Sequence, residues 1–446
     1  MRRIIIAGTN SGCGKTTVSC AVLAALKKRG VNVSAFKCGP DYIDPMFHRE
    51  VIGVPSHNLD SFFCDDDMLR YMLHKNAADS DIAVIEGVMG YYDGVDGRGS
   101  AYSVARLTDT PAIVVIGCNG MSDSIGAVMK GFLEYRVPSY VVGFIFNRLP
   151  ERLAPLAKKL CEELGTGYFG SLPKTDITVE SRHLGLVTAD EISDVKTRLN
   201  ALGELAEKHI DLDRIMRLPE RGSPVFTAPV IKAPASADRP VIAVAKDRSF
   251  CFIYDDNIDL LKKLGCEIRY FSPLADSHIP GDADGLILCG GYPELYAKEL
   301  SGNTEMLADI REKINSGMPT IAECGGFMYL HETFTDMDAN EYSGAGVIRA
   351  KAYRTAKLQR FGYVTLTAKS DNLLCAAGEG FPAHEFHYFD STDCGSGMTA
   401  EKSDGRKWEC VHATDSMYAG FAHLYLYSDP RIAENFVRKC IKWRDR

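Results

Sequence analysis

The chain has 446 residues, of which 46% are hydrophobic and 25% are charged, and it contains no low-complexity tract. This composition is typical of a globular protein and excludes collagen-like, fibrous and wholly disordered chains. At roughly 150 residues per domain, the length predicts two or three domains, each with its own core. The net charge is −8, so we expect no general attraction to nucleic acid.

No segment of the sequence predicts export or membrane insertion. The apolar run near the N-terminus ends at Gly8, which makes it far shorter than the core of a secretory signal. No run approaches the ~18 apolar residues that span a bilayer. The 14 cysteines are too dilute for a disulfide scaffold, so we expect reduced thiols in a soluble, cytoplasmic protein.

The first half of the sequence alternates short apolar runs, typical of strands, with longer helical patterns. Apolar strands that alternate with helices predict a parallel sheet covered on both faces. The strand-to-helix loops of such a sheet meet at one edge, where ligands bind. The expected strands are 3–7, 31–37, 82–86, 112–116 and 140–146, and the expected helices are 16–28, 121–134 and 153–164.

A proline-rich stretch at 221–240 lacks helical periodicity and predicts an extended linker between domains at 1–220 and 241–446. A second alternating series follows the linker, and beyond residue 340 the pattern becomes richer in strands. The sequence therefore predicts two α/β domains. The expected strands of the second are 241–245, 268–271, 285–288 and 320–322, and its expected helices are 256–264 and 304–314.

A glycine-rich loop, GTNSGCGKTT, joins the first expected strand to the first helix. Glycines let backbone N–H groups turn around phosphate oxygens, and the helix N-terminus adds partial positive charge. Lys15 would reach the β- and γ-phosphates, and the Thr16 hydroxyl would bind Mg²⁺. The first glycine, Gly8, lies six residues before Gly14 instead of the usual five. The alternative is a glycine-rich turn with an exposed lysine.

Two neighbouring strand ends supply carboxylates for a magnesium–nucleotide site, namely Asp41 with Asp44 and, after the third strand, Glu86. Mg²⁺ is held by one or two carboxylates together with phosphates and water. A buried Glu86 needs a metal or lysine partner, whereas turn chemistry beside prolines is the alternative for the two aspartates. Asn147 ends the fifth strand, where it would bind a base edge or cap the strand.

Two other polar clusters have simpler interpretations. The run Asp65-Asp66-Asp67 predicts a helix N-cap. His384 and His387 are three residues apart in a strand-like stretch, whereas a zincin needs histidines four apart on a helix. We therefore expect no catalytic zinc there.

A second site is expected around Cys324, in the segment AECGGF. A strand, a sharp glycine-flanked turn and a helix form a nucleophile elbow, and the helix N-terminus lowers the pKa of the thiol. Backbone N–H groups of Gly291 and Gly325 would form an oxyanion hole. The other cysteines are expected to be small buried side chains. The expected base is His423, although a lone histidine is as often structural.

Taken together, these segments resemble the cobyrinic acid a,c-diamide synthases of the cobyrinate/cobyric acid synthase family, over essentially the whole chain. The resemblance implies a dethiobiotin-synthetase-like ATPase domain followed by a class I glutamine amidotransferase domain. The ATPase relatives share the six-residue glycine spacing. The segments that carry the resemblance are GTNSGCGKTT, KCGPDYIDPMFH, LDSF, VIEGVMGYYDG, FNR, SRHLGL, GGYPELY, AECGGFMYL, LQRFGY, HEFHY and GFAHLY.

The resemblance implies a reaction. Cys324 attacks the glutamine amide with His423 as acid and base, and ammonia is released. ATP phosphorylates a carboxylate of the corrinoid, and ammonia converts the acyl phosphate to an amide, at positions a and c in turn. The residues implied to surround the glutamine are Gly290, Gly291 and Gly325.

The resemblance also implies roles for residues of the ATPase domain. Those implied to hold the ATP phosphates are Gly12, Gly14, Lys15, Thr16 and Thr17, while Asn147 contacts the base. The Mg²⁺ ligands would be Thr16, Asp41 and Glu86, and the catalytic carboxylates Asp41, Asp44 and Glu86. The residues implied to face the tetrapyrrole's carboxylates are Tyr42, Asp44 and His48.

One position departs from the wider amidotransferase pattern. Most triads have a Glu two residues after the His, and that position is Tyr425 here, as in this subfamily. The group that orients the His423 ring is therefore open, and Glu385 is one candidate.

Two alternatives remain at the level of sequence. The first is the same diamidation on sirohydrochlorin or its nickel complex, in coenzyme F430 synthesis. The second is a nucleotide switch similar to ParA and MinD with a non-catalytic glutaminase domain, which would dimerise with nucleotide and consume no glutamine. The expected partners are small molecules, with neither nucleic acid nor membrane, and the oligomeric state is open to a homodimer.

Overall fold

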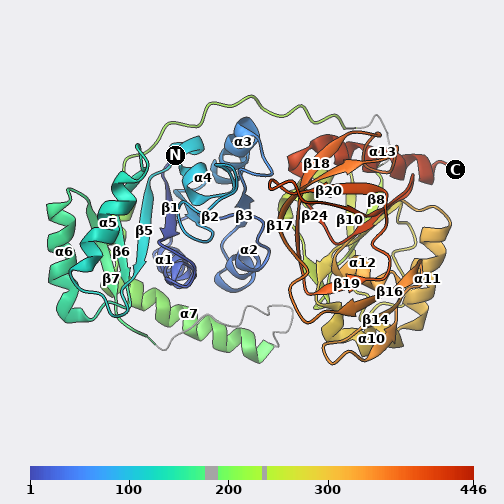
Figure 1. Ribbon diagram of the computed structural model, residues 1–446, viewed down its shortest axis with the longest axis horizontal. Helices are drawn as coiled ribbons and strands as arrows, with labels where there is room; N and C mark the ends of the chain where they lie inside the picture. Colours follow the sequence, from blue (N-terminus) through green and yellow to red (C-terminus); the bar gives the residue numbers. More distant parts are fainter. Residues whose placement is uncertain (176–188, 234–238) are drawn as a thin grey trace. The chain divides into compact units, whose positions relative to one another are not determined.

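Two units make up the computed structural model, which describes residues 1–175, 189–233 and 239–446. The units are Met1–Pro229 and Val230–Arg446 (Figure 1). Their boundary lies within the stretch 221–240 that the sequence suggests as a linker. The SRHLGL segment, at 181–186, lies outside the described residues.

A parallel sheet forms the centre of the first unit, with strand order β3-β2-β4-β1-β5-β6-β7. The five expected strands are present within two residues of their expected ends. The structure adds β3 and β7, whose sequences, SHNL and GYFGSL, lack a continuous apolar run. The strands are β1 Arg3–Gly8, β2 Val33–Cys38, β3 Ser56–Leu59, β4 Ile82–Glu86, β5 Ala112–Gly117, β6 Val141–Asn147 and β7 Gly167–Leu172.

Helices cover both faces of this sheet. Side chains of α1 and α7 share one apolar cluster with alternate residues of the central strands, and α3 and α4 lie on the other side (Figure 1). The Asp65 carboxylate accepts a hydrogen bond from the Met68 N–H (2.7 Å), which confirms the expected N-cap. The helices are α1 Lys15–Lys28, α2 Ile43–Phe47, α3 Asp66–Ala77, α4 Ala101–Thr108, α5 Ser124–Glu134, α6 Ala154–Glu163, α7 Ala189–His209 and α8 Leu212–Met216.

The second unit is built on a sheet of order β10-β8-β11-β13-β23-β22, in which only β22 is antiparallel. The two-domain α/β fold is therefore confirmed. The strands are β8 Val241–Ala245, β10 Glu267–Phe271, β11 Gly285–Leu288, β13 Thr320–Glu323, β22 His412–Ala413 and β23 Met417–Gly420. The helices are α9 Asp255–Lys263, α10 Ala297–Gly302, α11 Thr304–Asn315, α12 Gly325–Tyr329 and α13 Pro430–Arg444.

Smaller sheets accompany this central one, and two of them lie largely beyond residue 340, where the sequence pattern is rich in strands. One is the pair β9 Phe250–Phe252 and β12 Gly290–Gly291. A four-stranded sheet contains β14 His331–Thr335, β15 Glu341–Ser343, β16 Ile348–Arg354 and β19 Phe389–Ser391. An antiparallel sheet contains β17 Arg360–Ala368, β18 Gly380–His387, β20 Met398–Glu401, β21 Lys407–Cys410 and β24 His423–Leu424.

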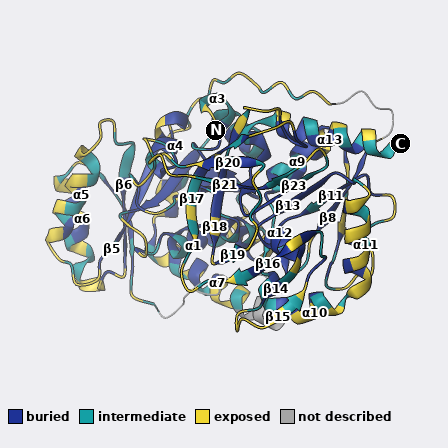
Figure 2. Ribbon diagram, turned by 45° about the vertical axis from the view of Figure 1, so that its right-hand side comes forward, coloured by how far each residue is buried: buried dark blue, intermediate teal, exposed yellow. Residues whose placement is uncertain are grey.

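Burial follows this layering in both units. The central strands are almost wholly buried, while the helices carry exposed residues on their outer sides (Figure 2). Among the described residues, no helix is long and apolar enough to cross a membrane.

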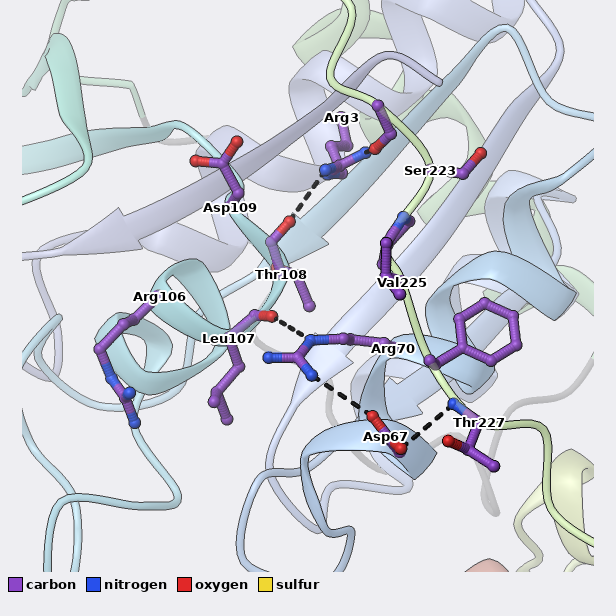
Figure 3. A pocket seen from close by; sticks show the side chains of 13 residues that line it. Arg3, Asp67, Arg70, Arg106, Leu107, Thr108, Asp109, Ser223, Val225 and Thr227 are labelled. Carbon is purple, nitrogen blue, oxygen red and sulfur yellow. Dashed lines mark hydrogen bonds and ion pairs between the residues drawn. The ribbon is translucent and has the colours of Figure 1, made fainter.

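The beginning of the expected linker is bound to the first unit. Residues 222–227 line a cavity of about 720 Å³ beside α3 and the end of α4. Figure 3 shows Asp67 between the Arg70 guanidinium (3.4 Å) and the backbone N–H of Thr227 (3.1 Å). The Phe226 ring packs edge-on against Tyr71, with centroids 5.7 Å apart. The segment is extended, as expected, but it is not free chain.

Removing the Phe226 ring should increase the fraction of molecules in which residues 222–227 are detached from the first unit. The Phe226→Ala variant loses aromatic contacts with Tyr71 and His74, worth about 1 kcal/mol, which corresponds to about a five-fold larger detached population. Limited proteolysis by a non-specific protease should then cut within residues 222–229 about five-fold faster. The matched control is Val225→Ala, because Val225 is 87% exposed. Equal cleavage rates in the two variants would contradict the docking.

Candidate active sites

The glycine-rich loop connects the end of β1 at Gly8 to the start of α1 at Lys15. Gly14 adopts a left-handed conformation (φ 96°), and a Cβ there would lie 1.9 Å from Nδ2 of Asn147. A Cβ on Gly8 would lie 2.3 Å from Sγ of Cys13. A side chain at either end of the loop would therefore require neighbouring atoms to move.

Asn147 supports this loop from behind. Its side-chain amide donates a hydrogen bond to the Cys13 carbonyl (2.9 Å), and the residue is 4% exposed. The sequence suggests a contact with the nucleotide base, whereas the structure directs this amide to the loop backbone. The strand-end capping alternative describes the observed geometry better.

The other expected phosphate-binding residues lie on the loop and the first turn of α1. Lys15 donates to the Asn10 carbonyl (3.4 Å), and burial lowers the pKa of its ammonium group. Thr16 donates its hydroxyl proton to Oε1 of Glu86 (2.7 Å). Gly12 has a left-handed conformation (φ 82°) and open space where a side chain would begin, and Thr17 lies in the first turn of α1. These residues have the arrangement of a phosphate-binding loop at the N-terminus of a helix.

A buried lysine, Lys37, connects the expected carboxylates. Its ammonium group lies 2.5 Å from Oδ2 of Asp44, 2.8 Å from Oε1 of Glu86 and 3.9 Å from Oδ2 of Asp41. The Lys37 side chain is 5% exposed and that of Glu86 is 1% exposed. The structure therefore joins Asp41, Asp44, Glu86 and Thr16 into one charged cluster at the ends of β2 and β4.

The charges of this cluster depend on one another. Burial opposes the charge on Lys37, but the Asp44, Glu86 and Asp41 carboxylates outweigh it and raise its pKa well above the usual value. Burial likewise opposes the charge on Glu86, yet Lys37 and His48 bring the pKa of that carboxyl far below its usual range. Burial and the neighbouring Asp41 raise the pKa of Asp44 to about 7. Lys37 and Glu86 are therefore charged at neutral pH, while Asp44 can exchange a proton there.

The donor atoms of this cluster fit Mg²⁺. Thr16, Asp41 and Glu86 offer the hard oxygen ligands that this ion prefers, and three carboxylates face only two ammonium groups, Lys15 and Lys37. Within the described ranges, no three acidic, histidine or cysteine side chains form a ready metal-binding group. The ion would therefore complete its shell with phosphate oxygens and water.

The structure separates the residues expected to face a tetrapyrrole. Asp41 is the accessible one, with its side chain 31% exposed, although Oδ1 also accepts the Ile43 N–H (2.8 Å), as the turn interpretation predicts. Tyr42 and Asp44 are buried, at 9% and 6% exposed. His48 is fully buried, with Nδ1 3.1 Å from the Ser56 hydroxyl and Nε2 3.5 Å from Glu86. His48 therefore contacts Glu86 from a buried position, and a contact between His48 and the tetrapyrrole stays a prediction.

The nucleophile elbow is present in the second unit. Cys324 follows β13 and precedes α12, with a strained backbone (φ 47°, ψ −101°). A Cβ on Gly326 would lie 2.1 Å from the Leu288 carbonyl oxygen, so only glycine permits this close approach. The Cys324 N–H donates to the Gly420 carbonyl (2.8 Å), and the residue is 8% exposed. The turn holds the thiol at the end of the sheet, as nucleophile elbows do.

His423, at the start of β24, contacts this cysteine. Burial alone would lower the pKa of its imidazole, but the charge of Cys324, a hydrogen bond with Cys324 and the nearby Glu323 raise it to about 10. The ring nitrogen Nδ1 lies 3.4 Å from Oε2 of Glu323. The negative charge of a Cys324 thiolate and the positive charge of a His423 imidazolium would therefore stabilise each other.

The two glycines of β12 border the same site. A Cβ on Gly290 would lie 2.6 Å from Cε1 of His423. The backbone nitrogen of Gly291 lies 3.1 Å from the position of a Cβ on Gly325. These backbones therefore converge beside Cys324, where an oxyanion hole is expected.

Two residues of these sites were not assigned from the sequence. Lys37 is the next-to-last residue of β2 and Glu323 is the last residue of β13, and each meets an opposite charge there. The argument that a buried Glu86 needs a partner applies equally to them, so this signal was available. Glu385, the candidate for orienting His423, lies 3.8 Å from the Arg360 guanidinium, whereas the contact with Nδ1 comes from Glu323.

Comparisons with known proteins agree with the two units. A family model described as the CobQ/CobB/MinD/ParA nucleotide binding domain matches residues 4–187, and one described as the CobB/CobQ-like glutamine amidotransferase domain matches residues 241–430. Solved structures align over about half of the chain. They include the cell division ATPase MinD of Pyrococcus furiosus, at 20% identity, a TM-score of 0.30 and coverage of 47% of this chain and 99% of the other.

Curated relatives align over nearly the whole chain. A cobyrinate a,c-diamide synthase of Caldanaerobacter subterraneus is 37% identical over 98% of this chain and 98% of its own. Proteins of the same name from Priestia megaterium (36% identical; 98% and 97% covered) and Thermoplasma volcanium (38% identical; 99% and 98% covered) are similar. The chain therefore belongs to the cobyrinate a,c-diamide synthase family.

Proposed function

We propose that this chain uses ATP and glutamine to convert the a- and c-carboxylates of cobyrinic acid to amides. The observation that carries the proposal is the presence, in one chain of this family, of a thiol–imidazole pair and a phosphate-binding loop. A glutaminase needs the first and an ATP-dependent ligase needs the second.

The amidotransferase unit would release ammonia from glutamine. The Cys324 thiolate attacks the side-chain amide carbon, and the N–H groups of Gly291 and Gly325 stabilise the oxyanion of the tetrahedral intermediate. His423 donates a proton to the departing amine, so ammonia leaves and a thioester forms. Water then hydrolyses the thioester to glutamate and restores the thiol. The contact between Cys324 and His423 supports this assignment.

The ATPase unit would activate the carboxylate. A carboxylate oxygen of the corrinoid attacks the γ-phosphorus of ATP, so ADP leaves and an acyl phosphate forms. Ammonia then attacks the acyl carbon, phosphate leaves, and the nitrogen loses a proton to give the amide. Lys15 stabilises the charge that develops on the transferred phosphoryl group. Mg²⁺ bound by Thr16, Asp41 and Glu86 would supply further neutralisation of the phosphate charge.

The cluster around Lys37 would prepare this second site. Lys37 and Glu86 stay charged, which keeps Thr16 bound to Glu86 and the carboxylates near the loop. Asp44 lies 2.5 Å from the Lys37 ammonium group and helps to hold it in place. Free ammonia is mostly protonated at pH 7, which explains why the nitrogen is generated from glutamine.

Replacing the nucleophile should separate the two activities. The Cys324→Ala variant should lose glutamine-dependent amidation, because no thioester can form, yet keep amidation with added ammonium within about two-fold. Product formation with each nitrogen source, measured by mass spectrometry, checks this. Loss of both activities in a folded variant would contradict the division of roles.

Replacing the loop lysine should abolish synthesis from either nitrogen source. The Lys15→Ala variant lacks the charge that stabilises phosphoryl transfer, so we expect a loss of about 10²-fold or more in amide formation. Glutamine hydrolysis at Cys324 should continue. Lys28→Ala is the matched control, since Lys28 is on the same helix with its side chain 59% exposed. Amide formation by the Lys15 variant at the control's rate would refute the phosphate-binding role.

The choice of substrate tests the proposal as a whole. The purified chain, with ATP, Mg²⁺ and glutamine, should add two amides to cobyrinic acid and none to nickel-sirohydrochlorin offered in parallel. Product from the sirohydrochlorin alone would assign the same residues to a different tetrapyrrole. Nucleotide-dependent dimerisation without glutamine consumption would instead support a nucleotide switch.

A further inference from the structure

We propose that Glu323 is the positioning residue of the glutaminase site. It would orient the His423 ring from the position directly before the nucleophile, and not from the usual position two residues after the histidine. The inference rests on the proposed function and extends it to a residue on the strand that carries the nucleophile. In this chain the position two residues after His423, where most class I amidotransferases have a glutamate, is Tyr425.

The Glu323 carboxylate contacts both the ring and the backbone of β24. Oε2 lies 3.4 Å from Nδ1 of His423, and Oε1 accepts the Leu424 N–H at 3.3 Å. Glu323 and His423 are 7% and 3% exposed. Glu323 ends β13 and Cys324 is the next residue. The same turn therefore positions both the nucleophile and the carboxylate beside the His423 ring.

Other candidates for this role are directed elsewhere. The Tyr425 hydroxyl donates to Oδ2 of Asp256 (3.2 Å). Glu385 pairs with Arg360 at 3.8 Å, and burial raises the pKa of its carboxyl to about 7, so its negative charge is only partly present near neutral pH and is directed to Arg360. The contacts therefore leave Glu323 as the carboxylate placed against Nδ1.

The titratable groups that face His423 come from the end of β13 and from β18. Cys324 and Glu323 lie at the end of β13, and β18 contributes His384, opposite His423 in the strand pairing, with Glu385 and His387. Burial lowers the pKa of His384 to about 3 and that of His387 to about 4, so both are neutral. Glu323 is thus the group that stabilises an imidazolium beside the thiolate.

This arrangement has a chemical consequence. A carboxylate at Nδ1 keeps the proton of the neutral ring on that nitrogen, which leaves Nε2 as the base. It also stabilises the imidazolium that forms when the ring takes the Cys324 proton. Because Glu323 would act through His423, its effect should appear in turnover and in thiol ionisation.

The test compares Glu323→Gln and Glu323→Asp with Glu385→Gln in the full chain. Glutamine preserves the acceptor for the Leu424 N–H but removes the charge, so the local fold is kept. The readouts are kcat and KM for glutamine hydrolysis, ammonium-dependent amidation, and the pH dependence of Cys324 alkylation by iodoacetamide. Alkylation at high pH, where the thiol ionises without help, reports whether the elbow is intact.

We expect Glu323→Gln to lower kcat about 10-fold or more with KM within about two-fold, because a positioned acid–base group is weakened while glutamine still binds. The alkylation midpoint should rise by about one pH unit, since the imidazolium that favours the thiolate is less stable. Glu323→Asp should recover part of both effects. Ammonium-dependent amidation should be unchanged, and Glu385→Gln should resemble the unaltered chain.

The inference is overturned if Glu323→Gln leaves kcat and the alkylation midpoint unchanged, or if Glu385→Gln produces the larger shift. A lower kcat with an unmoved midpoint would also overturn it, because that result indicates a structural role. Failure of the proposed function is distinguishable. In that case the unaltered chain hydrolyses no glutamine, while the alkylation profile still reports whether Glu323 controls the Cys324–His423 pair.

Discussion

A charged side chain that leaves water needs an opposite charge inside the fold, and this constraint shapes both sites. In the first unit Lys37 and Glu86 are almost wholly buried and lie 2.8 Å apart, with Thr16 bound to the same carboxylate oxygen. In the second unit Glu323 lies against His423 beside Cys324. Removing one partner would leave an unpaired buried charge, so each group holds the next in place.

Strand ends bring these charges together. Parallel strands end at the same edge of their sheet, so residues far apart in sequence meet there without any sequence motif joining them. Lys37 is the next-to-last residue of β2, Glu86 ends β4 and Glu323 ends β13. The glycines at Gly14 and Gly326 let the neighbouring turns approach closely enough for phosphate-binding and nucleophilic groups to lie at that same edge. The ligase and glutaminase chemistries thus use one structural principle twice.

The sequence predicts what is local, and it misses what depends on packing. Apolar runs locate the main strands, and the glycine patterns locate the loop before Lys15 and the turn at Cys324. The polar strand β3 and the contacts of Lys37 depend on neighbours distant in sequence, so periodicity cannot reveal them. The sequence predicts ligand contacts for His48 and Asn147, and the structure adds what the sequence does not show, namely that their polar atoms contact Glu86 and the Cys13 carbonyl. A motif identifies which residues matter, but only the fold decides which partner each one contacts.

The most direct test of the account follows the atoms of one reaction. Cobyrinic acid labelled with ¹⁸O in its carboxylates would be incubated with the purified chain, ATP, Mg²⁺ and glutamine labelled with ¹⁵N in its side-chain amide. The account predicts two ¹⁵N amides in the corrinoid and the transfer of one ¹⁸O atom to inorganic phosphate for each amide formed. Amides without ¹⁵N, or phosphate without ¹⁸O, would contradict a mechanism in which Cys324 supplies the nitrogen and an acyl phosphate receives it.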